Sequence, residues 1–172
     1  FCGEAHSLMG VRVVAESEAD FQEWAESWRT PAPTANAPVV AEASVIGTPG
    51  GEAGEAPMQA SGDEDPLVAR GREVFFRESY CVLCHAIEGT AAAGIIGPNL
   101  TRVGSRSTIG AGMLENTPAN LEAWLRDPGA IKPGVQMPGA DYEITYEGQT
   151  FPPTNLNDEQ IRALAAYLSS MR

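Results

Sequence analysis

The residues with the clearest chemistry lie in the run Cys81-Val82-Leu83-Cys84-His85. Two cysteines separated by two residues and followed by a histidine form the attachment signature of a c-type haem. The two thiols add to the two vinyl groups of one porphyrin, and the two intervening residues let both sulfurs reach the same porphyrin edge. The adjacent histidine then places its imidazole under the iron. The pattern predicts one covalent haem c, with Cys81 and Cys84 as anchors and His85 as an iron ligand.

Two other uses of paired cysteines are weaker interpretations of this motif. A thioredoxin-like dithiol follows a strand in a β-α-β unit, whereas the residues before Cys81 have the pattern of a helix. A zinc site needs about four ligands. The chain has three Cys and two His, and Cys2 and His6 are separated from the motif by a long low-complexity segment. We therefore favour haem attachment over both alternatives.

A methionine is expected as the second iron ligand. His6 and His85 are the only histidines, so two histidine ligands from the C-terminal region are excluded. Methionine with histidine suits an electron-transfer haem, because the thioether raises the reduction potential. Met137 is favoured since it lies in a stiff loop, 132–139, that contains two prolines and two glycines. Met113, in a glycine-rich loop, is the alternative. The remaining methionines are Met9 and Met58, outside the domain, and Met171, on the apolar face of the last helix.

The elements that position these residues are expected to be helices joined by long loops. Loops as long as 86–116 and 128–156 are unusual in a core made of protein alone, but they fit a chain that wraps a large apolar cofactor. The alternation of Tyr142, Ile144 and Tyr146 ahead of Glu147-Gly148 predicts a small hairpin. The starts of three helices are marked by Asp65-Pro66, by Thr117-Pro118, and by the capping-box pair Asn157 and Gln160.

Residues 63–172 resemble the class I cytochrome c family, which implies an all-α fold wrapped around one haem. In that family the first and last helices cross at close range, here at Gly71. The resemblance also implies that the Pro98 carbonyl holds the His85 imidazole, and that the loop ending in Met137 supplies the second ligand. The residues that carry it are Gly71, Phe75, Gly97-Pro98-Asn99-Leu100, Pro133-Gly134, Met137-Pro138, Leu164, Tyr167 and Leu168.

The family also binds the haem propionates through Trp, Tyr or Arg side chains. Trp124, Arg102 and Tyr142 are the candidates for this role. Core packing for Trp124 and simple surface exposure for Arg102 are the alternatives.

A second group of soft ligands lies near the N-terminus. Cys2, His6 and Met9 combine thiolate, imidazole and thioether, a set that suits copper in electron transfer. Their spacing resembles the binuclear copper loop of cytochrome c oxidase subunit II, which implies that Val11–Val14 form the next strand of a β cupredoxin barrel. The partner cysteine, the carbonyl ligand and the other histidine are absent, so the copper site is expected to be incomplete here and complete only in a longer parent protein. The alternative is a chance cluster.

Three regions follow from these patterns. Residues 1–29 are expected to be the remnant of a copper domain, including a short amphipathic helix through Phe21, Trp24 and Trp28. Residues 30–62, rich in Ala, Pro, Gly and Glu, are predicted to form a flexible linker. Residues 63–172 are expected to form the cytochrome c domain.

The predicted function is electron transfer by a tethered haem domain of a bacterial oxidase subunit II. The electron would come from a cytochrome, an iron-sulfur protein or a membrane complex, and would pass to the binuclear copper centre of the same subunit. Oxygen reduction would occur in another subunit. The alternatives are an electron-entry domain of a dehydrogenase or nitrogen-oxide reductase, and a haem sensor module.

Charge and hydropathy limit the kinds of binding partner and the cellular location that we expect for this chain. The net charge of −12 argues against nucleic acid. The single lysine, Lys132, cannot build the lysine ring that many soluble cytochromes c use for docking. No apolar run is long enough to cross a bilayer, although the parent is expected to have such segments. Covalent haem attachment places the domain on the periplasmic side or the outer face of the bacterial membrane.

Overall fold

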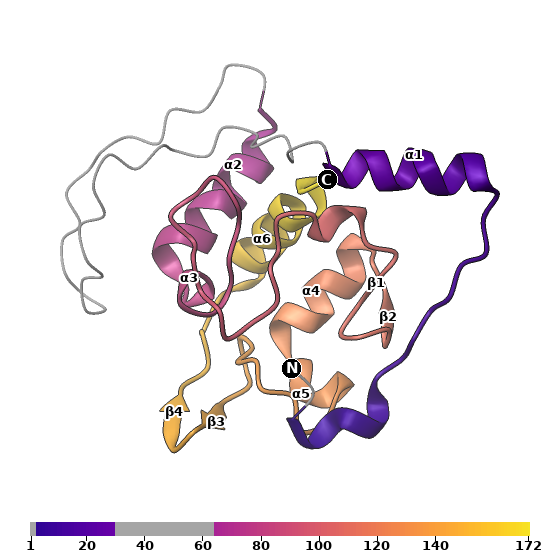
Figure 1. Ribbon diagram of the computed structural model, residues 1–172. Helices are drawn as coiled ribbons and strands as arrows, with labels where there is room; N and C mark the ends of the chain where they lie inside the picture. Colours follow the sequence, from indigo (N-terminus) through magenta and orange to yellow (C-terminus); the bar gives the residue numbers. More distant parts are fainter. Residues whose placement is uncertain (1–2, 30–63) are drawn as a thin grey trace.

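The computed structural model describes residues 3–29 and 64–172. The C-terminal region is built around its longest helices (Figure 1). These helices are α2 (Pro66–Glu73), α4 (Pro118–Arg126) and α6 (Asp158–Ser170). Helix α2 continues into a π-helical turn, η2 (Val74–Glu78), in which Val74 and Phe75 are fully buried. The predicted helical architecture is therefore confirmed.

Local capping explains where the three helices begin. The Asp65 side chain accepts a hydrogen bond of 2.8 Å from the Leu67 amide, and Pro66 occupies the first turn, where a missing N–H costs nothing. The Thr117 hydroxyl accepts from the Asn120 amide in the same way at 3.2 Å. At α6, the side chains and amides of Asn157 and Gln160 bond reciprocally at 2.9 and 3.0 Å. All three predicted starts are confirmed.

Helices α2 and α6 cross at close range because Gly71 has no side chain. A Cβ at that position would overlap the Ala163 carbonyl oxygen and approach Tyr167 Cβ to 2.7 Å. The Phe75 and Tyr167 rings pack beside the crossing with centroids 5.9 Å apart. The close approach implied by the family resemblance is therefore present.

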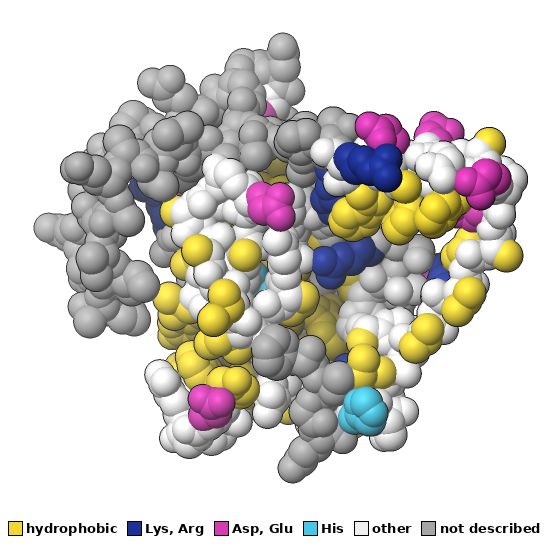
Figure 2. Space-filling model, viewed as in Figure 1, with side chains coloured by type: hydrophobic (Ala, Val, Ile, Leu, Met, Phe, Trp, Pro, Cys, Tyr) yellow, Lys and Arg dark blue, Asp and Glu magenta, His cyan; other side chains and the backbone are white. Residues whose placement is uncertain are grey.

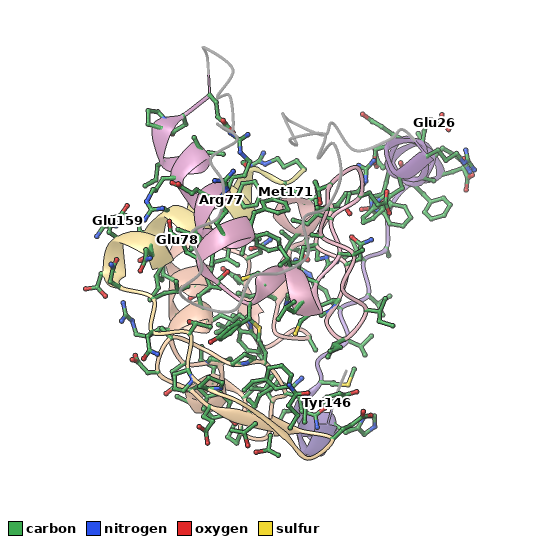
Figure 3. All side chains as sticks on the ribbon, turned by 90° about the vertical axis from the view of Figure 1, so that its left-hand side faces the viewer. Glu26, Arg77, Glu78, Tyr146, Glu159 and Met171 are labelled. Atoms are coloured by element: carbon green, nitrogen blue, oxygen red, sulfur yellow. The ribbon has the colours of Figure 1, made fainter. Side chains whose placement is uncertain are left out.

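A polar cluster closes one edge of this crossing. The Arg70 guanidinium donates to Glu78 Oε2 at 3.1 Å and to Glu159 Oε1 at 3.2 Å, and Gln160 Nε2 donates to Glu78 at 2.6 Å. Figure 3 shows Glu78 and Glu159 on the same side of the molecule, from the π-helical turn and from α6. These bonds tie the segment that leads into the cysteine motif to the last helix.

Short elements complete the C-terminal region. Helix α3 (Cys81–Cys84) carries the cysteine motif, η3 (Val103–Ser105) is a 3-10 turn, and α5 (Pro128–Ile131) follows α4 directly. Strands β1 (Thr108–Ile109) and β2 (Leu114–Glu115) form one antiparallel hairpin, and β3 (Ile144–Tyr146) and β4 (Gln149–Phe151) form another.

The second hairpin is the one that the sequence predicts. Its turn residues Glu147 and Gly148 have φ values of 49° and 79°, and positive φ at both central positions is what a tight two-residue hairpin turn requires. Ile144 pairs with Phe151 across the strands.

The N-terminal region differs in part from its prediction. It consists of a 3-10 turn, η1 (Gly3–Leu8), an extended coil, and helix α1 (Glu18–Arg29). The amphipathic helix is confirmed. The strand over Val11–Val14 is wrong, because this segment is coil, with Val11 and Val13 87 % and 86 % exposed. A β-branched run becomes a strand only when another strand supplies hydrogen bonds, and no strand pairs with it in the part of the chain that the structure describes.

The apolar face of α1 is largely open to solvent. Phe21, Trp24 and Trp28 are each about half exposed, and Figure 2 shows hydrophobic side chains along this helix at the rim of the molecule. The predicted linker over residues 30–62 lies outside the described residues. Within the described ranges, no helix has the length and apolar character needed to cross a membrane.

Candidate haem site

The cysteine motif forms one helical turn. Helix α3 begins at Cys81 and ends at Cys84, so the two thiols are three residues apart on a helix and therefore neighbours on its surface. The His85 amide closes the turn by donating to the Cys81 carbonyl at 2.9 Å, and His85 itself has extended backbone angles. The turn thus presents two thiols together, with an imidazole at the point where the chain leaves the helix.

Both thiols are held in their protonated form. Burial raises the pKa of Cys81 to about 11, only partly opposed by the hydrogen bond that Ser79 Oγ donates to Cys81 Sγ at 3.1 Å. Burial also raises the pKa of the Cys84 thiol. Catalytic redox dithiols instead depend on a lowered thiol pKa. The redox-dithiol alternative is therefore disfavoured.

His85 is fixed in one tautomer. Its Nδ1 lies 2.8 Å from the Pro98 carbonyl oxygen, and because a carbonyl can only accept, Nδ1 carries the hydrogen. Burial lowers the pKa of His85, so the ring is neutral at physiological pH. The remaining nitrogen, Nε2, keeps its lone pair free for a metal. The Pro98 contact implied by the family resemblance is therefore present.

Glycines in the following loop let the backbone pack against the motif. A Cβ at Gly97 would lie 2.5 Å from His85 Cε1, and a Cβ at Gly94 would overlap the backbone at Cys84. The Gly97 amide donates to the Cys84 carbonyl at 2.6 Å, and the Gly94 amide donates to the His85 carbonyl at 3.2 Å. The sequence identifies Gly97 through its neighbour Pro98, but nothing in it marks Gly94.

Met137 and Trp124 are brought together from different elements. The indole Nε1 of Trp124, on α4, donates a hydrogen bond to Met137 Sδ at 3.2 Å. The Trp124 ring packs over Gly110, where a Cβ would lie 2.8 Å from the ring carbon Cζ3. Met137 packs against the hydrophobic core, whereas Met113 is half-buried in the turn before β2. Met137 thus has a hydrogen-bond donor and a packed apolar surface around its thioether, which favours it over Met113 as the second iron ligand.

The other candidates lie apart from this group. The Arg102 guanidinium sits 5.3 Å from the ring centroid of Trp28 on α1, a cation–π contact. The Tyr142 ring covers Gly129 on α5, where a Cβ would overlap it. His6 and Met9 are exposed, and Cys2 lies outside the described residues. Across residues 3–29 and 64–172, no three His, Cys, Asp or Glu side chains are grouped as metal ligands.

Comparison with known proteins assigns the sequence to a family. The family model described as cytochrome c matches residues 68–172, more than half of the chain. The chain therefore belongs to the cytochrome c family.

The most informative relatives are larger proteins. The chain is 32 % identical to the cytochrome c oxidase subunit 2 of Alkalihalophilus pseudofirmus, and 30 % identical to that of Bacillus subtilis. Each alignment covers 99 % of this chain and 37 % of the relative, so the similarity includes the residues ahead of 68, and the chain spans well under half of each relative's length. Among solved structures, the c-type cytochrome SorU from Sinorhizobium meliloti matches 63 % of this chain and 93 % of its own, with 27 % identity and a TM-score of 0.39.

Proposed function

We propose that this chain carries one covalent haem c, bonded to Cys81 and Cys84, with His85 and Met137 as the iron ligands. The observation that carries the proposal is the 2.8 Å contact between His85 Nδ1 and the Pro98 carbonyl, in a residue that directly follows two neighbouring thiols. Bound there, the haem supplies a one-electron couple between ferrous and ferric iron.

The side chains of this chain hold and tune the group. Cys81 and Cys84 would hold the porphyrin through thioether bonds, and the Pro98 carbonyl fixes the His85 ring with Nε2 free to bind the iron. Met137 would supply the second iron ligand. Trp124 orients the Met137 thioether through its N–H and leaves one sulfur lone pair for the metal. A saturated pair of ligands suits electron transfer and disfavours a sensor that must bind a ligand at the iron.

The biological role we propose is that of a tethered electron carrier in subunit II of a bacterial haem–copper oxygen reductase. Three curated proteins with 30–32 % identity over 99 % of this chain are named cytochrome c oxidase subunit 2. In this proposal residues 63–172 form the haem domain, 30–62 the tether, and 1–29 the end of a copper domain whose ligands include Cys2, His6 and Met9. Oxygen reduction takes place in another subunit of the complex.

The charge of the surface supports an attached partner. Lys132 is the only lysine in the chain and is 2 % exposed, so the surface carries no lysine ring. The net charge of −12 also gives no positive field that would steer the domain to an acidic partner over long range. A tether replaces steering, because it raises the effective concentration of the haem domain at the copper domain. Covalent haem places the domain on the outer side of the cytoplasmic membrane.

Maturation of the chain in a host that attaches c-type haem tests the proposal. We expect a coloured product whose mass exceeds that of the polypeptide by one haem. Met137→Ala should lose the thioether-to-iron absorption band and lower the reduction potential, whereas the matched Met113→Ala variant should do neither. A colourless wild type would refute haem attachment, and an effect of Met113→Ala alone would move the second ligand to Met113. Binding of added carbon monoxide by the reduced wild type would favour the sensor.

A further inference from the structure

The turn between β1 and β2 has an unusual backbone. Gly110, Ala111 and Gly112 all have positive φ, at 62°, 62° and 85°. A positive φ is uncommon for alanine, and three in succession set this turn apart from the other turns of the domain. The turn is exposed at Ala111 and Gly112, which makes its backbone accessible to another segment.

The outer side of this turn is covered by the segment that follows the predicted copper ligands. The Gly10 amide donates a hydrogen bond of 2.7 Å to the Ala111 carbonyl. A Cβ at Gly112 would lie 2.9 Å from Gly10 Cα and from the Gly10 carbonyl oxygen, so the two backbones meet where neither residue has a side chain. Gly10 directly follows Met9. Figure 1 shows the N-terminal coil passing beside the β1–β2 hairpin.

The inner side of the same turn packs against Trp124, which in turn contacts the candidate iron ligand. The Trp124 ring packs on Gly110, and its Nε1 donates to Met137 Sδ at 3.2 Å. One continuous series of contacts therefore runs from Gly10 through the 110–112 turn and Trp124 to Met137.

A second contact holds the N-terminal region to the same domain. Arg102, beside η3, lies 5.3 Å from the Trp28 ring centroid of α1. The N-terminal region is thus attached at Gly10 and again at Trp28, on either side of its exposed coil.

We propose that the turn 110–112 is the docking surface of the haem domain for the copper domain of the parent subunit, whose ligand loop ends at Gly10. This inference rests on the proposed function and adds the surface of the haem domain through which the electron passes to the copper domain. Trp124 then lies between the docked loop and the iron ligand Met137. One electron leaves the ferrous haem, which becomes ferric, and the binuclear copper centre gains that electron. No bond forms or breaks and no proton moves.

A matched pair of glycine substitutions tests the docking surface. Gly112→Ala introduces a Cβ against Gly10 at a φ of 85°, whereas Gly148→Ala introduces the same group at a φ of 79° with nothing within 4 Å. The backbone penalty is therefore similar, and only the first variant disturbs the contact with Gly10.

Two measurements on haem-loaded protein read out the effect. In the 172-residue chain, hydrogen exchange at the Gly10 amide should be slowed in the wild type and about fivefold faster in Gly112→Ala, which is the loss of one hydrogen bond of about 1 kcal/mol. In the copper-loaded parent subunit, the rate of electron transfer from haem to copper after flash reduction should fall about fivefold. Gly148→Ala should change neither.

The outcomes separate the two proposals. Random-coil exchange at Gly10, or equal transfer rates in both variants, would overturn the docking surface while leaving haem electron transfer intact. A wild type that never reduces its copper would instead overturn the proposed function. Should Gly112→Ala fail to take up haem, Gly10→Pro removes the donor N–H from outside the haem domain. Its readout is the rate of electron transfer in the parent subunit, and a rate equal to that of the wild type would overturn the docking surface.

Discussion

The hydrogen bond from Trp124 to Met137 makes a quantitative prediction about the reduction potential. Its N–S distance is 3.2 Å and the contact is partly buried, so removal of the N–H in Trp124→Phe keeps most of the ring while losing the bond. The donated hydrogen withdraws electron density from the sulfur. A thioether that donates less to the iron stabilises the ferrous form relative to the ferric form. With Met137 as the proposed iron ligand, this bond should raise the reduction potential of the wild type, and Trp124→Phe should have a lower reduction potential.

The size of the shift follows from the energy of the bond. Sulfur is a weak acceptor, so the bond belongs at the lower end of the usual range, about 0.5–1 kcal/mol. For a one-electron couple about 1.4 kcal/mol corresponds to about 59 mV. If the whole energy distinguishes the two oxidation states, the potential falls by about 20–40 mV.

A spectroscopic redox titration measures this shift. The wild type and Trp124→Phe are titrated together, with the thioether-to-ferric-iron band recorded at each potential to show that Met137 stays bound. Trp28→Phe is the control, since Trp28 lies on α1 and contacts Arg102 rather than the methionine. A band that persists in Trp124→Phe together with an unchanged or higher reduction potential would refute an effect of this hydrogen bond on the potential.

Two further predictions concern stability in the haem-loaded chain. Gly71→Ala places a methyl group onto the Ala163 carbonyl, and overpacking of this kind should lower the free energy of unfolding by about 3 kcal/mol. The expected fall in Tm is roughly 12–24 °C, which differential scanning calorimetry measures. A fall in Tm no greater than that of Gly148→Ala would contradict the prediction. The hydrogen bond from Arg70 lowers the pKa of Glu78 below 4.5, so the stabilising effect of Glu78 is complete above about pH 4.5 and is lost as the pH falls through the lowered value. Denaturant unfolding of Glu78→Gln should therefore show a deficit at pH 7 that shrinks toward pH 3, and a deficit that stays constant with pH would exclude this linkage.

Helix starts were predictable because their causes are local. Asp65, Thr117 and Asn157 each satisfy an amide two or three residues ahead, and such contacts depend only on adjacent sequence. The hairpin at Glu147-Gly148 belongs to the same class, since its turn chemistry lies within two residues. In contrast, the β-branched run Val11–Val14 is coil, because a strand needs partners that local sequence does not provide.

The sequence by itself determined the proposed chemistry of attachment, since Cys81, Cys84 and His85 lie within five residues and their spacing fixes what they can reach. The tertiary structure decided the rest of the site. The His85 tautomer depends on a carbonyl 13 residues away at Pro98, and the setting of Met137 depends on Trp124, also 13 residues away. The burial of Lys132 likewise follows from packing. Each of these contacts joins residues from different elements of the fold. Rules that use only neighbouring residues, such as capping and turn preferences, therefore do not predict them.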